Sequence, residues 1–365
     1  MKRTNNVCVL AVLVVAVLTM ASQSRAQQTL RYRTGGAWEN VSDGITPGWG
    51  VNPDQPGSSV PVAGDEARVN WAGSTVTLDY AAPAFERLLI GVDEAGTMEV
   101  NGGGVLSAIQ DVVVGNNNFT EGYMDVNDGA TVDVGRILWV GKGGPNDGPG
   151  DTLGYLNINS GGVVNVANHL WWGVKGTAEV NISGTLNQTG GILGLGTINA
   201  LDSGAQGGTA VVNILDGGLM ALNNIHAGGT QSSIQPGSYI DISGSGQLTL
   251  PGDFVGVLEG YRDASKLYGN GVPGAVDIAL SPVVGGPGDF NDDGVVDGAD
   301  FLEWQRDTNV GALADWQTNY GTTGMQTVVT AMSAPIIAAV PEPGALTLML
   351  TSALALSGFR RRSFR

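Results

Sequence analysis

The chain has 365 residues, and its glycine content, charge and cysteine content are all unusual. It contains 58 glycines and only 14% charged residues, while 42% of its residues are hydrophobic. An average soluble domain holds roughly 7% glycine and about 25% charged residues. The apolar side chains suffice for a core, which excludes a disordered polar chain, and the glycines keep no three-residue period, which excludes collagen. A glycine-rich, all-β protein with short strands and many turns remains.

The charge restricts the partners. The net charge is −17 at pH 7, and residues 27–340 carry 10 basic and 33 acidic side chains. Such an excess of carboxylates repels phosphate backbones, so we expect no nucleic-acid binding. The only cysteine, Cys8, lies near the N-terminus, so the remaining chain forms no internal disulfide.

Residues 1–26 have the three parts of a secretory signal peptide. Lys2 and Arg3 precede an apolar stretch from Val7 to Leu18, and small residues lead to Ala26. This order predicts export, with cleavage after Ala26.

Residues 27–90 contain several tryptophans and prolines and are predicted to form an irregular N-terminal cap. Residues 91–250 carry an internal repeat, whose copies open and close with glycine and contain an apolar-x-(Val/Ile)-Asn sequence. The copies are Gly96–Gly115, Gly122–Gly141, Gly154–Gly173, Gly176–Gly196 and Gly208–Gly228. They begin 22 to 32 residues apart, which is typical of solenoid repeats. A degenerate sixth copy falls at Ser238–Gly244 and a leading one at Val76–Ile90, and extra residues at Lys142–Leu153 and Thr197–Gly207 are predicted to form loops at one corner.

Apolar and polar residues alternate within each copy, which places the apolar ones on an inner face. We expect two short strands per coil, stacked into a right-handed parallel β-solenoid. The repeated asparagines should then form one ladder at a corner; they are Asn101, Asn127, Asn159, Asn181 and Asn213. The repeats resemble the glycine-rich repeats of autotransporter passenger-like and PEP-CTERM-associated surface proteins.

Residues 251–287 are predicted to form a C-terminal cap and linker, with a short helix within Asp253–Leu267 and a strand within Ala275–Val284. A small module follows at 288–322. Its first twelve residues place oxygen donors at the spacing of a calcium loop, with Gly294 at the sharp bend. The expected ligands are Asp289, Asn291, Asp293, the carbonyl of Val295, Asp297 and Asp300. The alternative is an acidic turn that binds no ion.

This loop, with a helix from Phe301 and a second helical segment at Ala314–Gly321, resembles one half of a type I dockerin. Dockerins pair two such loops, and this chain lacks the second. Gly298 and Ala299 stand where many dockerins carry hydroxyl residues that contact cohesin. The resemblance therefore implies a structural calcium ion, with cohesin binding doubtful. Residues 323–339 are predicted to be a linker.

Residues 340–365 form a three-part tail. A Pro-Glu-Pro sequence precedes the apolar stretch Gly344–Phe359, which is slightly shorter than the ~20 residues of a spanning helix, and an arginine cluster follows. This tail resembles the PEP-CTERM sorting signal of bacterial surface proteins and implies cleavage by an exosortase-type transpeptidase. The alternative is an ordinary tail anchor. The signal residues are Pro341, Glu342, Pro343, Arg360, Arg361 and Arg362.

No catalytic constellation is visible in the sequence. His169 and His226 fall in different columns of the repeat, and Arg136 and Lys175 are isolated, so a lyase site of the kind that β-helices carry is not expected. Trp139 and Trp171 occupy the same outward position in successive coils, where their flat rings could contact a sugar. The alternative for this pair is mutual stacking or cover from a corner loop.

The sequence thus predicts an exported cell-surface or extracellular protein, transiently anchored in the inner membrane by its C-terminal helix. Its expected role is structural or adhesive and not enzymatic, with calcium as cofactor and extracellular polysaccharide as a candidate partner. The alternative is a carbohydrate-binding or cohesin-docking component of polysaccharide degradation.

Overall fold

The computed structural model describes residues 28–332 except 34–35, 42–47, 52–58, 71–74, 118, 145–150, 197–206, 228–231, 283–285 and 322–323. The chain divides into the units Met1–Ala331 and Met332–Arg365, and nearly all described residues belong to the first. The predicted leader and the predicted sorting tail lie outside the described residues. No helix in the described part is long and apolar enough to span a membrane.

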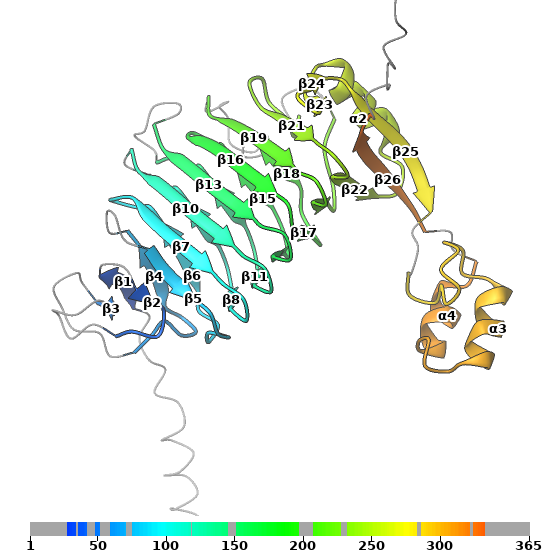
Figure 1. Cartoon of the computed structure of the whole chain (residues 1–365), viewed down its shortest axis with the longest axis horizontal. Coiled ribbons are helices and arrows are strands. Elements are labelled where there is room, and N and C mark those ends of the chain that lie inside the picture. Colours follow the sequence, from blue (N-terminus) through cyan, green and yellow to red (C-terminus); the bar gives the residue numbers. More distant parts are fainter. Residues whose placement is uncertain are drawn as a thin grey trace, which may run out of the picture. The chain divides into compact units, whose positions relative to one another are not determined.

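Most of the described chain is strand, arranged in three sheets whose neighbouring strands are mainly parallel (Figure 1). Sheet A has the strand order β18-β15-β12-β9-β6-β4-β1-β3, where the strands are Leu193–Leu195, Leu170–Trp172, Leu138–Val140, Val112–Val114, Arg87–Ile90, Glu66–Val69, Thr29–Arg33 and Gly48–Gly50.

Sheet B has the order β2-β5-β7-β10-β13-β16-β19-β21-β23-β24, where the strands are Gly36–Ala37, Thr75–Leu78, Gly96–Val100, Glu121–Val126, Leu153–Ile158, Thr177–Ile182, Thr209–Ile214, Tyr239–Ile242, Leu267–Gly269 and Val272–Pro273. Sheet C has the order β25-β26-β22-β20-β17-β14-β11-β8, where the strands are Val276–Pro282, Met325–Ala331, Gln247–Pro251, Leu219–Ala221, Thr185–Gln188, Val163–Val166, Thr131–Val134 and Val105–Ala108.

Each complete coil passes through sheets B, C and A in that order, as in β7-β8-β9 followed by β10-β11-β12. This is a solenoid-like, all-β arrangement, as predicted. The prediction of two strands per coil is wrong, because each complete coil has three. The missed strands β8, β11, β14 and β17 are only four residues long and contribute two buried side chains each, so they resemble turns in the sequence.

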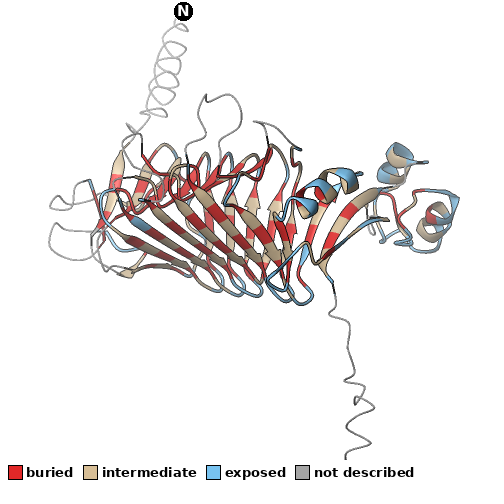
Figure 2. Ribbon diagram, turned by 90° about the horizontal axis from the view of Figure 1, so that it is seen from above, coloured by how far each residue is buried: buried red, intermediate tan, exposed pale blue. Residues whose placement is uncertain are grey.

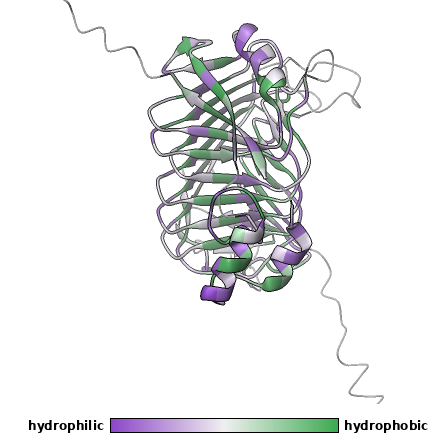
Figure 3. Ribbon diagram, turned by 90° about the vertical axis from the view of Figure 1, so that its right-hand side faces the viewer, coloured by the Kyte–Doolittle hydropathy of each residue, from purple (hydrophilic) through white to green (hydrophobic). Residues whose placement is uncertain are grey.

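The core lies between the three sheets. Along β7 and β10 every second residue is buried, and the intervening side chains are partly exposed. Figure 2 shows this alternation of buried and intermediate residues along the strands, and Figure 3 shows the matching alternation in hydropathy. Inward residues of successive coils lie in register, since Met98 pairs with Met124 and Val100 with Val126. The predicted inner columns of these coils are confirmed.

Glycine is required where the chain leaves sheet A and enters sheet B. Gly141 has φ +62°, and a Cβ there would lie 2.2 Å from the carbonyl oxygen of Thr177. A Cβ on Gly154 would lie 2.2 Å from the backbone nitrogen of Gly141 and 2.4 Å from the carbonyl oxygen of Val114. The glycines that open and close each repeat therefore allow successive coils to approach closely. In the chain, the predicted loop segments Lys142–Leu153 and Thr197–Gly207 fall between β12 and β13 and between β18 and β19, and their residues 145–150 and 197–206 lie outside the described residues.

The asparagines form ladders, but the prediction of one ladder is wrong. Asn127 donates to Asn101 at 2.7 Å and Asn159 to Asn127 at 2.6 Å, which makes one corner ladder. Asn181 and Asn213 belong instead to a ladder within sheet B, because Ile182 pairs with Ile158 and Ile214 pairs with Ile182. A shift of two residues leaves every side chain on the same face, so alternation alone could not detect it.

The ladder within sheet B begins at a carboxylate. Asn157 donates to Asp125 at 2.6 Å, Asn181 to Asn157 at 2.9 Å and Asn213 to Asn181 at 2.8 Å. A third ladder follows the outer face of sheet C, where Asn165 donates to Asp133 at 2.9 Å and Asn187 donates to Asn165 at 3.0 Å.

The predicted N-terminal cap is more regular than expected, because β1, β4 and β6 continue sheet A and β2 and β5 continue sheet B. An aromatic cluster closes this end. Trp38 and Trp49 are fully buried, with ring centroids 4.6 Å apart, and Trp49 contacts Tyr32 at 5.0 Å. The indole N–H of Trp49 donates to the carbonyl of Trp38 at 2.8 Å.

At the other end, the predicted helix and strand are both present, as α2 (Val255–Asp263) and β25. The assignment of 323–339 to a linker is wrong, because Met325–Ala331 forms β26, which pairs antiparallel with both β22 and β25. Thr327 is fully buried; it donates to the carbonyl of Gly252 at 2.8 Å and accepts from the N–H of Phe254 at 2.7 Å. The small module is therefore an insertion between two paired strands and not an appendage.

Candidate functional site

The expected calcium loop lies in the chain between β25 and β26. Its residues lead into α3 (Gly298–Arg306), which is followed by α4 (Leu313–Asn319). Asp297 is the N-cap of α3 and forms a capping box with Asp300, so the last predicted ligand is fixed in the first turn of the helix. Gly294 has φ +81°, as expected for the residue at the bend.

The loop carboxylates accept backbone hydrogen bonds within the loop. Asp289 accepts from the N–H of Asp293 at 3.0 Å and of Gly294 at 2.9 Å. Asn291 accepts from Asp293 at 3.0 Å, and Asp293 accepts from Val295 at 2.9 Å. These bonds wrap the chain around the first carboxylate.

Asp300 is fully buried and is bonded only to backbone in the described structure. It accepts from the N–H groups of Phe290 at 2.7 Å, Asn291 at 3.1 Å and Asp297 at 2.7 Å, and no ion pair reaches it within the described residues. Buried carboxylates usually have a cationic partner or a metal ion. The oxygen donors, the bend and the buried acid thus fit a calcium ion, although no group of three His, Cys, Asp or Glu side chains in the described chain is gathered as a metal shell.

Aromatic side chains join the two helices to each other and to the loop. The rings of Phe301 and Trp316 lie 4.9 Å apart, and those of Trp316 and Tyr320 lie 5.0 Å apart. The indole N–H of Trp316 donates to the carbonyl of Asp297 at 2.6 Å. The N–H of Gly321 donates to the carbonyl of Val296 at 2.7 Å, so the end of α4 contacts the loop directly.

A second candidate site lies on the outer face of sheet A. Trp139 and Trp171 pair in register on β12 and β15, and their ring centroids are 4.9 Å apart in an edge-to-face arrangement. Their outward position was predicted and is confirmed, because Leu138 and Val140 on either side of Trp139 belong to the main core.

The expectation that this pair faces solvent is wrong for Trp139, whereas Trp171 is partly exposed. Trp139 is only 9% exposed and belongs to a second hydrophobic cluster, separate from the main core, against which Trp171 packs. We call this the outer cluster; its buried members are Leu89, Val92, Val113, Ile137, Trp139 and Val174. The indole N–H groups of Trp139 and Trp171 are buried and have no hydrogen-bond partner in the described part of the chain.

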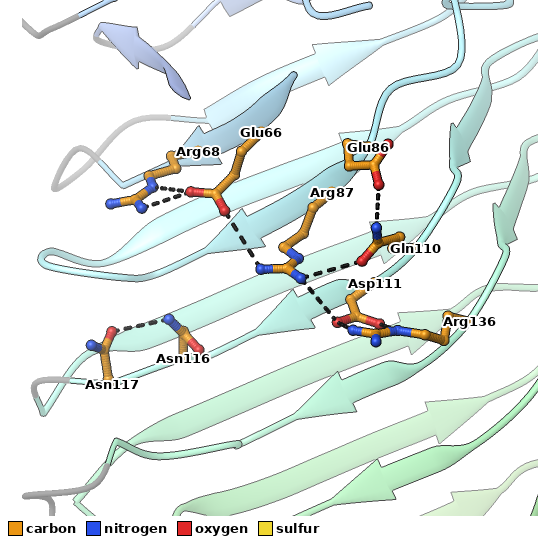
Figure 4. Close-up of polar contacts among 9 residues, drawn as sticks. All are labelled: Glu66, Arg68, Glu86, Arg87, Gln110, Asp111, Asn116, Asn117 and Arg136. Carbon is orange, nitrogen blue, oxygen red and sulfur yellow. Dashed lines mark hydrogen bonds and ion pairs between the residues drawn. The ribbon is translucent and has the colours of Figure 1, made fainter. Parts of the chain in front are cut away.

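Beside the outer cluster, ion pairs link successive coils (Figure 4). Arg68 contacts Glu66 at 2.6 Å, and Glu66 lies 3.7 Å from Arg87. Arg87 lies 3.8 Å from Asp111, which Arg136 contacts with two nitrogens, one of them at 2.8 Å. We call these five residues the charge ladder.

Sequence analysis missed this ladder and treated Arg136 as isolated, because its partner Asp111 belongs to the preceding coil. The pairing raises the pKa of Arg136, chiefly through its hydrogen bond to Asp111. Lys142 extends the group of cations, with its Nζ 4.9 Å from the ring centroid of Trp139. Burial lowers the pKa of Lys142, the charge of Asp111 opposes that shift, and the charges of Arg87 and Arg136 add to it.

Two other features were absent from the sequence-based predictions. On the outer face of sheet B, Tyr123 and Tyr155 stack with parallel rings 4.7 Å apart, and a hydrogen bond from Tyr123 to Glu121, with burial, raises the pKa of Tyr123 to about 12. A cavity of about 410 Å³ lies beside α2, lined mainly by apolar groups and by Tyr261 and Lys266.

Comparison with protein-family models, with curated proteins and with solved structures found no match to this chain.

Proposed function

We propose that the protein is an exported, non-catalytic structural or adhesive component of the cell surface, sorted by an exosortase-type transpeptidase. The proposed structural role rests on hydrogen bonds that surface side chains form between successive coils. Three ladders of asparagine and aspartate side chains hydrogen-bond from coil to coil along the outer faces and one corner. Such repeated bonds stiffen a stack of coils along its axis, which suits a scaffold.

Calcium is part of this proposal. Asp289, Asn291, Asp293, Asp297, Asp300 and the carbonyl of Val295 would hold the ion, and the ion would balance the loop's carboxylate charge. Because Pro282 of β25 pairs with Met325 of β26, the ends of the module are held together by the sheet. An ordered module would in turn keep these two strands together, so calcium would stabilise the end of the coil as well as the module.

The proposal of export and sorting rests on the sequences of the two ends of the chain, residues 1–26 and 340–365. The right-handed sense of the coil, the dockerin-like identity of the module and the membrane helix at 344–359 belong to the same proposal.

Surface labelling in the native host tests the proposed function. Intact cells are treated with an external protease and with an antibody against the coil, and a variant lacking residues 340–365 serves as the control. We expect the full chain to be degraded and labelled on intact cells, and the truncated variant to appear in the medium. Protection of the full chain until the cells are lysed would contradict the proposal.

A further inference from the structure

The basic residues of this acidic protein are concentrated at one sheet. Of the ten between residues 27 and 340, seven lie on strands of sheet A or within three residues of their ends. They are Arg31, Arg33, Arg68, Arg87, Arg136, Lys142 and Lys175. The other three lie on α2, after α2 and on α3. Five acidic residues lie there by the same criterion, so sheet A has a small positive balance within an acidic protein, and an anionic partner meets the least repulsion at this sheet.

Arg87 has unused donor capacity at the centre of this face. Its side-chain contacts are long: 3.4 Å to Gln110, 3.7 Å to Glu66 and 3.8 Å to Asp111. Ordinary hydrogen bonds from nitrogen to oxygen measure about 2.7–3.2 Å. Its Nε is buried with no hydrogen-bond partner among the described residues, although the side chain as a whole is 35% exposed. Because the Nε is buried, a carboxylate from outside would pair with the two Nη groups, whose contacts within the protein are long.

Two further cations stand next to Arg87. Arg136, whose side chain is 46% exposed, uses one edge of its guanidinium for Asp111. Lys142 is close enough to Arg87, Arg136 and Asp111 for their charges to act on it, and the ring of Trp139 lies under its Nζ. Asp111 thus interacts with three cations at the border of the apolar outer cluster, and Arg87 has Glu66 as a second acidic neighbour at 3.7 Å.

We propose that this part of sheet A binds a carboxylated polysaccharide, with Arg87, Arg136 and Lys142 contacting its uronate groups. The charged part of such a chain matches the cations, and its sugar rings present apolar C–H faces that can contact the partly exposed Trp171. A neutral glycan would leave the cations unused. Nucleic acid is the competing polyanion, and inorganic polyphosphate distinguishes it in the experiment below.

This inference names a ligand for the proposed adhesive role. It depends on the proposed function only for where in the cell the binding takes place. Binding is measured on purified protein, whereas sorting is measured in cells, so either can fail without the other. All binding is measured in EGTA, so that calcium bridging between the acidic module and the polysaccharide cannot contribute.

The experiment is a calorimetric titration of the purified protein with a polygalacturonate oligomer. The comparison ligands are the fully methyl-esterified oligomer, a neutral glucan oligomer and inorganic polyphosphate. The variants are Arg87→Gln and Lys142→Gln, with Arg306→Gln on α3 as a control that removes the same charge from an exposed position. Circular dichroism reports whether each variant is folded, and Lys142→Gln decides the outcome if Arg87→Gln disturbs the charge ladder.

We expect polygalacturonate to bind, with about a tenfold loss of affinity in Lys142→Gln and Arg87→Gln, as for loss of one charge-assisted contact. Arg306→Gln should bind like the unmodified protein, and the ester and the glucan should not bind measurably. Absence of polygalacturonate binding would overturn the proposal. So would equal binding of the ester or of polyphosphate, or an equal loss in Arg306→Gln.

Discussion

Replacing Trp139 by alanine tests whether the outer cluster is a genuine second core. A tryptophan side chain buries about 150–250 Å², and at about 25 cal/mol per Å² this corresponds to roughly 4–6 kcal/mol of transfer free energy. Trp139 is 9% exposed, and its neighbours would relax partly into the space it leaves. We therefore expect Trp139→Ala to lower the free energy of unfolding by about 3–4 kcal/mol, within the range for large-to-small core substitutions.

Two neighbouring tryptophans calibrate this prediction. Trp172 is fully buried in the main core, so Trp172→Ala should lower the free energy of unfolding by about 4–5 kcal/mol. Trp171 is partly exposed at the edge of the outer cluster, so Trp171→Ala should lower the free energy of unfolding by only about 1–2 kcal/mol. Equilibrium urea unfolding, followed by both circular dichroism and tryptophan fluorescence, gives the three values, and the agreement of the two probes checks that coils do not unfold separately. A change below about 1 kcal/mol for Trp139→Ala would show that its ring lies on an open surface.

Three other predictions concern the coil and the module. Asn181→Asp should lower the unfolding free energy by about 1 kcal/mol, because the new carboxylate cannot donate to Asn157; a mutant as stable as the parent would mean that the ladder contributes nothing. Gly154→Ala should cost more than about 3 kcal/mol or prevent folding, since its Cβ would collide with backbone of Gly141, and near-normal stability would contradict the close approach of the coils. Calcium should raise the melting temperature of the unmodified protein and not that of Asp289→Ala, and an equal response of both would remove the calcium assignment.

Alternation in the sequence was sufficient to predict which faces of the strands are buried, because a buried face requires an apolar residue at every second position. The glycines at the ends of each copy located the repeats, because they are needed for the close approach of the coils. Alternation has a limit, however. It could not reveal which residues stack on which. The corner ladder at Asn127 and the sheet ladder at Asn181 differ by a shift of two residues that preserves both the face and the polarity.

Features that depend on contacts between coils were harder to predict. Arg87 and Asp111 pair across coils whose lengths vary, so their spacing in the sequence carries no signal. The burial of Trp139 depends on a second apolar cluster outside the main core, whereas the rule of alternation assigns outward residues to solvent. The strand β26 follows a helical module and pairs with β22, far from it in the sequence, and its short alternating stretch was not distinguished from a linker.

The most direct test of the proposed function is the intact mass of the protein recovered from the envelope of its native host. We expect a mature form that lacks residues 1–26 and ends near Pro341-Glu342-Pro343, while Glu342→Ala should accumulate with the C-terminal arginines still present. Recovery of the unmodified protein with its leader and its final residue Arg365 intact would contradict both export and sorting.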